Sequence, residues 1–364
     1  MMDSKKILFV GYDMPGFGGK ETVCKNVYYM MMDKNPSINI EFLFIQDFRQ
    51  GPDEISDEWL GDISFSRISS GVYNTKIRRI HFSYKFAKFL KKKKPDIIIS
   101  IDPLSCYVTS LGKKLAMVKI PIYSWIHSSL DQLYKSTYSL NADYHLAISS
   151  GIKSQFIRRG VSADNIFTIF NPIKRSSEIM TRPSDIITFL YVGRLTDDDK
   201  NISEMFTALS KVNGNFELHI VGSGRDENEL KNLANKLKLQ NNIIWHGWKK
   251  KPWEFIESNI KEITTLLLTS NFEGFPMVLG EAVSRGIYCI SSNCITGPED
   301  IIIDGINGEL YPLNSVNCLV EKLQYIIDGK QLPNNIIIKE SIEDLYEEKY
   351  IENVFYALEN SNKK

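Results

Sequence analysis

Short runs of apolar residues alternate with longer amphipathic stretches along the 364 residues of this chain. The apolar runs are bounded by Gly, Pro and Asp, and such runs are typical of strands buried on both faces of a parallel sheet. In the first half of the chain the pattern predicts strands at 7–10, 40–45, 97–101, 120–125, 144–148 and 166–169. In the second half it predicts strands at 186–192, 216–221, 243–246, 264–269 and 288–291.

Between these strands, apolar residues recur at the helical period. Helices are predicted at 21–33, 77–92, 202–211, 227–237, 278–285, 316–327 and 341–358. Alternating strands and helices in both halves predict the α/β class, with two Rossmann-like, doubly wound domains. A length of 364 residues also agrees with two domains.

The expected domain boundary lies just after Asn171 and Pro172, where the polar segment 174–184 has no periodicity and resembles a linker. The first domain would then cover 1–172 and the second 173–340. The segment 341–364 would form a helix that crosses back to the first domain. Ligands of open α/β sheets bind at the carboxyl ends of the strands, so the residues that follow strands are the first candidates for a site.

Composition changes this picture little. Hydrophobic content of 43% and charged content of 24% are ordinary for a globular protein, and no apolar window reaches the ~20 residues of a membrane span. The first residues lack the apolar region of a signal peptide, so a cytoplasmic location is expected. The five cysteines form no CxxC pair and indicate free thiols in a reducing compartment rather than disulfides or a zinc site.

The net charge of zero hides an asymmetry. Residues 1–180 contain 25 Lys and Arg against 17 Asp and Glu, whereas the remainder contains 19 against 27. The pair Arg78-Arg79 and the run Lys91–Lys94 carry much of the excess. They indicate either a surface that faces an anionic membrane or a phosphorylated partner, or simply a solvated helix end.

In each half of the chain, a glycine-containing loop follows the first predicted strand. In the first half, Gly18 and Gly19 precede a helix, where backbone N–H groups can approach phosphate or hydroxyl oxygens, although a plain flexible turn is the alternative. In the second half, Arg194 follows a strand and Lys200 begins the next helix, so two cations on one rim suit a pyrophosphate. The intervening Asp197–Asp199 resembles a metal-binding motif, but a solvated loop that caps a helix is favoured because a metal would compete with both cations.

The most specific pattern is the segment 271–282, NFEGFPMVLGEA. Glu273 follows a buried strand, and Glu281 lies eight residues later, about two turns along the next helix. Gly274 and Pro276 predict a tight loop that turns its backbone amides toward a ligand. The segment would offer one carboxylate to sugar hydroxyls, amides to a phosphate and the second carboxylate to a ribose. The alternative is a chance pair of glutamates at a helix start.

This spacing, with Arg194 and Lys200 upstream, resembles the retaining glycosyltransferases of family 4, which have the GT-B fold of two Rossmann-like domains facing across a cleft. Longer segments resemble the lipopolysaccharide α-1,6-galactosyltransferases of enteric bacteria. These segments are FGGKET at 17–22, ADYHLAISSGIK at 142–153, IWHGW at 244–248 and TLLLTS at 265–270. The similarity extends from the first glycine loop to about Tyr311 and is weakest at 47–75 and at the C-terminus. The loop between Arg194 and Lys200 is one residue shorter than in those enzymes.

The resemblance implies a role for each matching position. The catalytic residues would be His127 at the donor sugar, Arg194 and Lys200 at the diphosphate, and Glu273 at the sugar hydroxyls. The UDP-sugar would also contact Gly18, Gly19, Gly222, Gly247, Trp248, Gly274, Phe275, Pro276, Met277, Val278 and, through the ribose, Glu281. The first domain would bind the acceptor and the second the UDP-sugar. No metal and no other cofactor is implied.

The expected reaction transfers galactose from UDP-galactose to a glucose of the lipopolysaccharide outer core, with retention of configuration, at the inner face of the bacterial inner membrane. In the mechanism that the family implies, a phosphate oxygen of the leaving UDP takes the proton of the acceptor hydroxyl. Transfer of glucose or N-acetylhexosamine to another lipopolysaccharide, O-antigen or capsule acceptor is the alternative. A non-catalytic nucleotide-sugar or lipopolysaccharide-binding protein is a further one. A nucleotide-sugar epimerase or dehydrogenase is disfavoured because no GxGxxG loop or Tyr-x-x-x-Lys pair stands in a suitable place.

Overall fold

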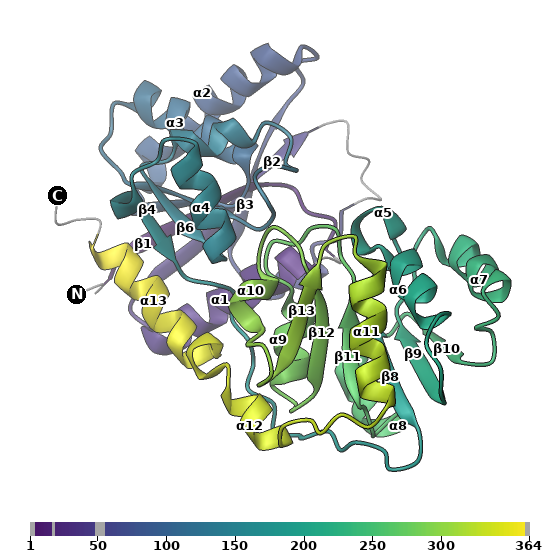
Figure 1. Cartoon of the computed structure of the whole chain (residues 1–364). Coiled ribbons are helices and arrows are strands. Elements are labelled where there is room, and N and C mark those ends of the chain that lie inside the picture. The colour runs from purple at the N-terminus through teal and green to yellow at the C-terminus, as the bar shows by residue number, and fades with distance from the viewer. Residues whose placement is uncertain (1–3, 17–18, 48–54, 361–364) are drawn as a thin grey trace. The chain divides into compact units, whose positions relative to one another are not determined.

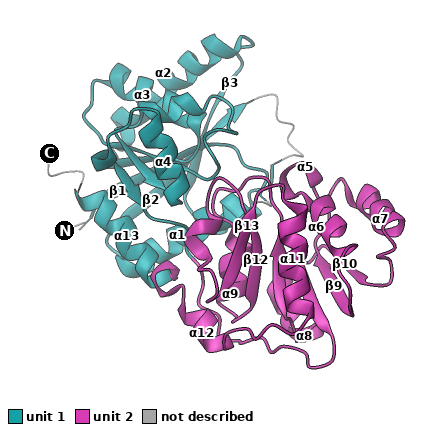
Figure 2. Ribbon diagram, viewed as in Figure 1, with its two compact units in different colours: residues 1–172, 347–364 teal, residues 173–346 magenta. Residues whose placement is uncertain are grey.

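The computed structural model describes residues 4–16, 19–47 and 55–360. The chain divides into two compact units, of which unit 1 comprises residues 1–172 with 347–364 and unit 2 comprises residues 173–346 (Figure 2). Each unit is built around one parallel sheet (Figure 1). The α/β class predicted from the sequence is confirmed in both units.

Unit 1 contains a seven-stranded sheet in the order β3-β2-β1-β4-β5-β6-β7, with every pair parallel. Its strands are β1 (Lys6–Tyr12), β2 (Asn39–Asp47), β3 (Phe65–Ser70), β4 (Ile97–Ser100), β5 (Ile122–Ile126), β6 (Tyr144–Ala147) and β7 (Ile166–Thr168). The central strands are buried along their whole length, which explains their uninterrupted apolar sequences. The strand β3 was not predicted, because FSRISS lies at the edge of the sheet and has only two apolar residues, Phe65 and Ile68.

Helices connect the strands of unit 1. The α-helices are α1 (Gly19–Lys34), α2 (Thr75–Lys93), α3 (Pro103–Ala116), α4 (Ser150–Arg158) and α13 (Glu347–Asn360), and the short 3-10 helices are η2 (Glu58–Leu60), η3 (Ser136–Asn141) and η4 (Ala163–Asn165). Side chains define several helix starts. The Asn74 side chain accepts hydrogen bonds from the amides of Lys76 and Ile77 in the first turn of α2. Asp102 forms a capping box with Ser105 in α3.

The last predicted helix begins later than expected. The residues predicted as its start follow α12 (Asn335–Glu340) and contain the turn η5 (Glu343–Leu345), and 341–346 belong to unit 2. Only α13 joins unit 1, where it packs against α1. The hydroxyl of Tyr123 on β5 donates a 3.3 Å hydrogen bond to the carbonyl of Ala357. The prediction of one helix through 341–358 was therefore wrong, because the chain turns between two separate helices, α12 and α13.

Unit 2 contains a six-stranded parallel sheet in the order β10-β9-β8-β11-β12-β13. Its strands are β8 (Ile187–Val192), β9 (Phe216–Val221), β10 (Ile243–Gly247), β11 (Thr265–Leu268), β12 (Tyr288–Asn293) and β13 (Gly308–Pro312). Besides α12 its α-helices are α5 (Asp197–Lys200), α6 (Ile202–Leu209), α7 (Glu227–Lys236), α8 (Pro252–Asn259), α9 (Met277–Val283), α10 (Pro298–Ile301) and α11 (Val316–Ile327).

The segment 174–184 has almost no regular structure, yet it is part of unit 2 rather than a free linker. Met180 is buried, and its amide donates a 2.9 Å hydrogen bond to the carbonyl of Arg285. The side chain of Asn335 donates to the carbonyl of Met180 at 2.7 Å. Its lack of periodicity reflects irregular backbone that other parts of the unit hold in place.

The basic residues of α2 divide between two faces. Lys91–Lys94 are exposed, in agreement with a solvated or surface-facing helix end. Arg78 and Arg79 are only 2% and 8% exposed, so the prediction of a solvated helix end was wrong for this pair, and neither arginine lies on an exposed surface. They lie on the helix face that also buries Phe82, Phe86 and Leu90 against the rest of unit 1. Within the described part of the chain, no helix combines the length and apolar character needed to cross a membrane.

Candidate active site

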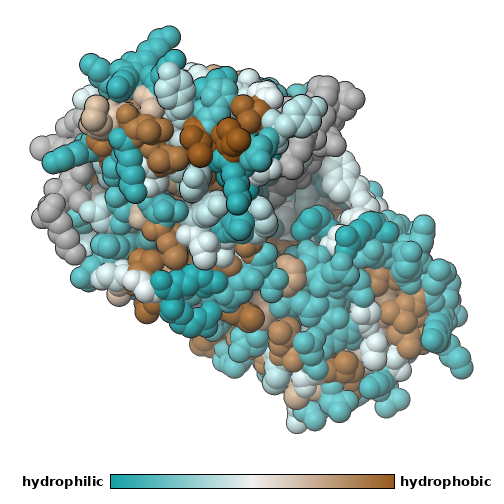
Figure 3. All heavy atoms as spheres, turned by 90° about the horizontal axis from the view of Figure 1, so that it is seen from above, coloured by the Kyte–Doolittle hydropathy of each residue, from teal (hydrophilic) through white to brown (hydrophobic). Residues whose placement is uncertain are grey.

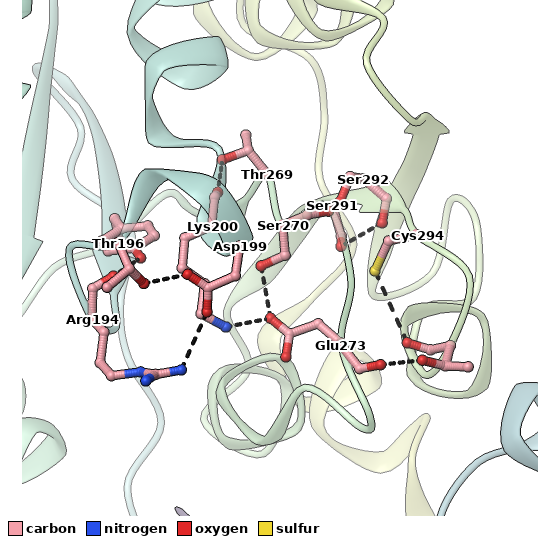
Figure 4. A network of polar contacts seen from close by, with 12 residues as sticks. Arg194, Thr196, Asp199, Lys200, Thr269, Ser270, Glu273, Ser291, Ser292 and Cys294 are labelled. Carbon is pink, nitrogen blue, oxygen red and sulfur yellow. Dashed lines mark hydrogen bonds and ion pairs between the residues drawn. The ribbon is translucent and has the colours of Figure 1, made fainter. Parts of the chain in front are cut away.

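An ion pair at the carboxyl edge of the unit 2 sheet joins the two halves of the predicted donor motif (Figure 4). The ammonium of Lys200 donates to Oε1 of Glu273 at 2.6 Å, and both side chains are largely buried. The hydroxyl of Ser270 donates to the same carboxylate oxygen at 2.7 Å. Residues 73 positions apart in the sequence therefore form one charged pair with a fixed geometry.

Backbone contacts hold this pair in place. After β11, the hydroxyl of Thr269 donates to the carbonyl of Lys200 at 2.9 Å. The amide of Asn271 donates to the carbonyl of Asp199 at 2.8 Å, and its side chain donates to the carbonyl of Asp198 at 2.9 Å. The hydroxyl of Thr296 donates to the carbonyl of Glu273. The two loops thus fit together through main-chain groups that do not depend on the charged side chains.

Arg194 is an exposed cation at this edge of the sheet. It follows β8, its side chain is 74% exposed, and Nη2 lies 3.2 Å from Oδ2 of Asp199. Asp199 also accepts a hydrogen bond from the hydroxyl of Thr196. Because Arg194 is mostly solvated and pairs with a single carboxylate, its guanidinium can turn toward an oxyanion at low cost.

The aspartates between the two cations each have a partner within the protein. Asp197 accepts a 2.8 Å hydrogen bond from the amide of Ser203 at the start of α6, and Asp198 is paired with Arg225. With Asp199 on Arg194, the three carboxylates do not converge on one point. The run forms the short helix α5 and caps the next helix, in place of the solvated loop that the sequence indicated.

The second glutamate of the motif, Glu281 in α9, lies in a separate cluster. Its carboxylate accepts a 2.8 Å hydrogen bond from the indole N–H of Trp253 in α8. Arg285 lies one turn further along the chain and stacks over the Trp253 ring at 4.4 Å. Burial raises the pKa of Glu281, while the Trp253 hydrogen bond and the charge of Arg285 oppose this rise. The two neighbours therefore favour the ionised carboxylate that a ribose contact would need.

The glycine loops after β8, β9 and β10 lie against one another. The amide of Gly222 donates to the carbonyl of Gly247 at 3.0 Å, and the amide of Gly193 donates to the carbonyl of Val221 at 3.1 Å. Gly222 has a φ of +150°, and a Cβ there would come 1.8 Å from the carbonyl oxygen of Gly193. No side chain fits at position 222.

Trp248, another predicted site residue, directly follows β10 and is largely exposed.

The tight loop predicted before α9 is present. Gly274 is half-buried, and Phe275 and Pro276 are buried. The helix α9 begins at Met277, followed by Val278, and its N-cap residue Pro276 makes no side-chain capping hydrogen bond. The predicted positions 273–281 therefore lie in one local unit, which follows β11 at the carboxyl edge of the sheet.

The predicted residues of the first half lie in unit 1. His127 follows β5 at the carboxyl edge of that sheet, with its ring 4.3 Å from the ring of Trp125. Its buried Nε2 has no hydrogen-bond partner in the part of the chain that the structure describes. Burial and the nearby charge of Lys20 lower the pKa of His127 to about 3, so the imidazole is neutral at physiological pH. Gly19 is the first residue of α1, whereas Gly18 lies outside the described residues.

Sequence reasoning missed several residues of the unit 2 site. Thr269 and Ser270 directly follow β11, four and three residues before Glu273, and this position after a strand was a usable signal. Trp253 gave no such signal, because it reaches Glu281 from a helix 28 residues upstream.

Comparison with known proteins shows the family to which the chain belongs. A family model described as "Glycosyl transferases group 1" matches residues 173–341. The lipopolysaccharide 1,6-galactosyltransferase of Salmonella typhimurium strain LT2 is 39% identical over 97% of this chain and 98% of its own length.

The chain belongs to the glycosyl transferases group 1 family. Among solved structures, a lipopolysaccharide outer core galactosyltransferase, WaaB in its apo form, matches with a TM-score of 0.93 and 38% identity. The match covers 98% of this chain and 99% of that one. The Anabaena protein HepE in complex with UDP matches with a TM-score of 0.77 at 16% identity, over 98% of this chain and 100% of that one, which is a likeness of fold. The two parallel sheets of this glycosyltransferase are those of the GT-B fold.

Proposed function

We propose that this glycosyltransferase transfers galactose from UDP-galactose to a glucose of a lipopolysaccharide outer core, forming an α-1,6 linkage with retention of configuration. The observation that carries the proposal is the Lys200–Glu273 ion pair, with Arg194 nearby on the same sheet edge. The pair brings a cation for the diphosphate next to a carboxylate for the sugar hydroxyls. The near full-length similarity to a lipopolysaccharide 1,6-galactosyltransferase supports the choice of sugar and acceptor.

In the proposed reaction the bond between the galactose C1 and the β-phosphate oxygen of UDP breaks, and a bond from the acceptor oxygen to C1 forms on the same face. The proton of the acceptor hydroxyl passes to an oxygen of the departing phosphate. Arg194 and Lys200 stabilise the negative charge that develops on UDP, and Glu273 holds the sugar hydroxyls. Glu281 binds the ribose. The loops at Gly222 and at Gly247 and Trp248 frame the uracil.

The test supplies the purified protein with UDP-galactose and a lipopolysaccharide truncated before the proposed galactose. Mass spectrometry of the product should show the addition of one hexose, and its linkage should be α-1,6 by NMR. UDP-glucose and UDP-N-acetylglucosamine are run in parallel, and a higher kcat/KM with either would contradict the choice of donor. Because Asp197–Asp199 are engaged within the protein, EDTA should leave the rate unchanged. Release of no UDP with any donor would favour a non-catalytic binding protein.

We further propose that α2 docks this enzyme on the anionic inner face of the bacterial inner membrane. Ile77, Ile80 and Tyr84 are exposed on one face of α2, and Tyr73 is exposed just before the helix begins. Residues 75–93 contain six Lys, the two buried Arg and no Asp or Glu. Figure 3 views the side of the molecule on which α2 lies in Figure 1, and apolar side chains gather there among hydrophilic ones. Such a helix suits the interface of an anionic bilayer.

Sedimentation with vesicles tests this docking. Ile77→Ser combined with Ile80→Ser should reduce binding to vesicles of phosphatidylglycerol and phosphatidylethanolamine by about tenfold. The matched control is Ile336→Ser with Ile337→Ser in unit 2, since Ile77, Ile336 and Ile337 are each 57% exposed. Binding of the wild type should weaken as salt rises. Equal loss in both double variants, or equal binding to neutral phosphatidylcholine vesicles, would contradict the proposal.

A further inference from the structure

A cavity in unit 1 is not part of the site described above. Its volume is about 390 Å³, within the range of small-ligand pockets. It lies where β1 and β2 end and where α2 begins, so it occupies the carboxyl edge of the sheet. Its walls include Tyr12, Asp47, Thr75, Arg78, Arg79 and Tyr134.

The two arginines of this cavity differ in how their charge is balanced. Arg78 lies 3.0 Å from the carboxylate of Asp47 and also donates to the carbonyls of Val72 and Tyr73. Arg79 donates instead to the hydroxyl of Tyr138 at 3.3 Å and stacks over that ring at 5.5 Å. Among the described residues, no carboxylate forms an ion pair with Arg79. Among the groups that the structure describes, the cavity therefore holds one buried cation without a carboxylate partner.

An uncompensated buried cation is unfavourable for folding, and a binding site is the usual setting in which one is kept. Other groups of the cavity suit an oxyanion. Thr75 is the first residue of the 19-residue helix α2, whose amino end carries a partial positive charge. Burial raises the pKa of Tyr12, which keeps its phenol protonated as a hydrogen-bond donor. The nearby Asp102 is already engaged by the amides of Tyr12 and Ser105.

We infer that this cavity is a subsite for a phosphoryl group carried by the acceptor saccharide, with Arg79 as the residue that recognises it. The guanidinium has a planar set of donors that matches phosphate oxygens. The assignment to the acceptor rests on the proposed function, in which the cations for the UDP diphosphate are Arg194 and Lys200 of unit 2. Phosphorylation of the acceptor then becomes a determinant of which saccharides the enzyme accepts.

The decisive experiment compares two acceptors that differ only in phosphate. Calorimetry measures the binding of delipidated core oligosaccharide, before and after phosphatase treatment, to the wild type, Arg79→Gln, Arg79→Lys and Lys76→Gln. Removing the phosphate should weaken binding to the wild type by about tenfold or more and should leave binding to Arg79→Gln nearly unchanged. Arg79→Lys should keep part of the preference. Lys76→Gln removes the same charge from an exposed position three residues earlier and should behave as the wild type.

Each other outcome has a meaning. An equal phosphate preference in the wild type and in Arg79→Gln would overturn the assignment, as would no preference in the wild type. If inorganic phosphate bound the wild type as tightly as the phosphorylated saccharide did, the cavity would hold a free anion instead. Unchanged thermal unfolding of Arg79→Gln shows that the variant is folded. Because the readout is binding, a protein that bound the phosphorylated saccharide but transferred no galactose would refute the proposed reaction and leave the subsite standing.

Discussion

The carboxyl edges of the two sheets differ in how their polar and charged side chains are paired. At the carboxyl edge of unit 2 the groups of the proposed donor site are already paired, Lys200 with Glu273, Arg194 with Asp199 and Glu281 with Trp253. In unit 1, among the described residues, Nε2 of His127 has no hydrogen-bond partner and no ion pair balances Arg79. The groups of the proposed UDP site are thus paired before a ligand arrives, whereas these two groups of unit 1 lack such partners. This difference agrees with a site in unit 2 that recognises a constant group, UDP, and with residues of unit 1 that contact the sugars, the donor galactose at His127 and the acceptor at Arg79.

The largest expected effect concerns the exposed cation of unit 2. Arg194→Ala should reduce kcat by about 100-fold or more, because the developing charge on UDP loses a guanidinium that can turn toward it. Steady-state kinetics with saturating acceptor measures this. The control is Lys236→Ala, which removes an exposed cation at the carboxyl end of α7, on the opposite edge of the sheet. A loss below threefold in Arg194→Ala would show that this arginine does not act on the leaving group.

The next effect concerns the ribose contact. Glu281→Ala should weaken UDP binding by about 10- to 100-fold, since a charged acceptor of ribose hydroxyl hydrogen bonds is lost. Calorimetric titration with UDP gives the affinity directly. Glu273→Ala serves as the comparison and should lower turnover more than UDP affinity, because UDP carries no galactose. Unchanged UDP affinity in Glu281→Ala would end the ribose assignment.

A smaller effect is expected at the unpartnered histidine of unit 1. His127→Ala should lower kcat by about tenfold through loss of one hydrogen bond to the donor sugar. UDP affinity should stay the same. With a pKa of about 3, the wild-type imidazole stays neutral, so the activity should show no His127 ionisation between pH 5 and 8. An inflection near pH 6.5 that disappears in the variant would contradict the neutral role.

The smallest effect sharpens the view of unit 2 as a site of paired groups. Trp253→Phe keeps the packing but removes the N–H that Glu281 accepts, so UDP affinity at pH 7.5 should fall only about threefold. The lost hydrogen bond favoured the ionised carboxylate, so its removal raises the pKa of Glu281 further. As the pH falls, UDP affinity should therefore be lost at a higher pH in the variant than in the wild type. Calorimetric titration with UDP from pH 8 to 5 measures this. If the pH profiles of UDP affinity were the same in the variant and the wild type, Trp253 would not position Glu281.

The same contrast explains what could be predicted from the sequence. The donor motif was readable because Glu273 and Glu281 lie eight residues apart, and because Arg194 follows a strand. The pairing of Lys200 with Glu273 spans 73 residues and depends on the neighbouring strands β8 and β11. The order of strands in a sheet is not encoded in local periodicity. The cavity around Arg79 was missed for the same reason, since Tyr12, Asp47 and Tyr134 come from distant segments.

Local pattern also misjudged the faces of α2. Arg78 and Arg79 lie within a basic helix and gave the appearance of surface residues, yet Ile77 and Ile80 beside them are the exposed ones. The helix packs its arginines inward because Asp47 and Tyr138, far away in sequence, provide partners. Hydrophobicity by itself would have placed these side chains the other way round.

The central claim is that the two carboxyl edges have separate tasks, UDP binding in unit 2 and acceptor recognition in unit 1. Galactose transfer with both substrates varied, for Glu281→Ala and Arg79→Gln side by side, tests it most directly. The account predicts that Glu281→Ala raises the KM for UDP-galactose alone and that Arg79→Gln raises the KM for the phosphorylated acceptor alone. If each variant raised both constants equally, the division of tasks between the two units would be wrong.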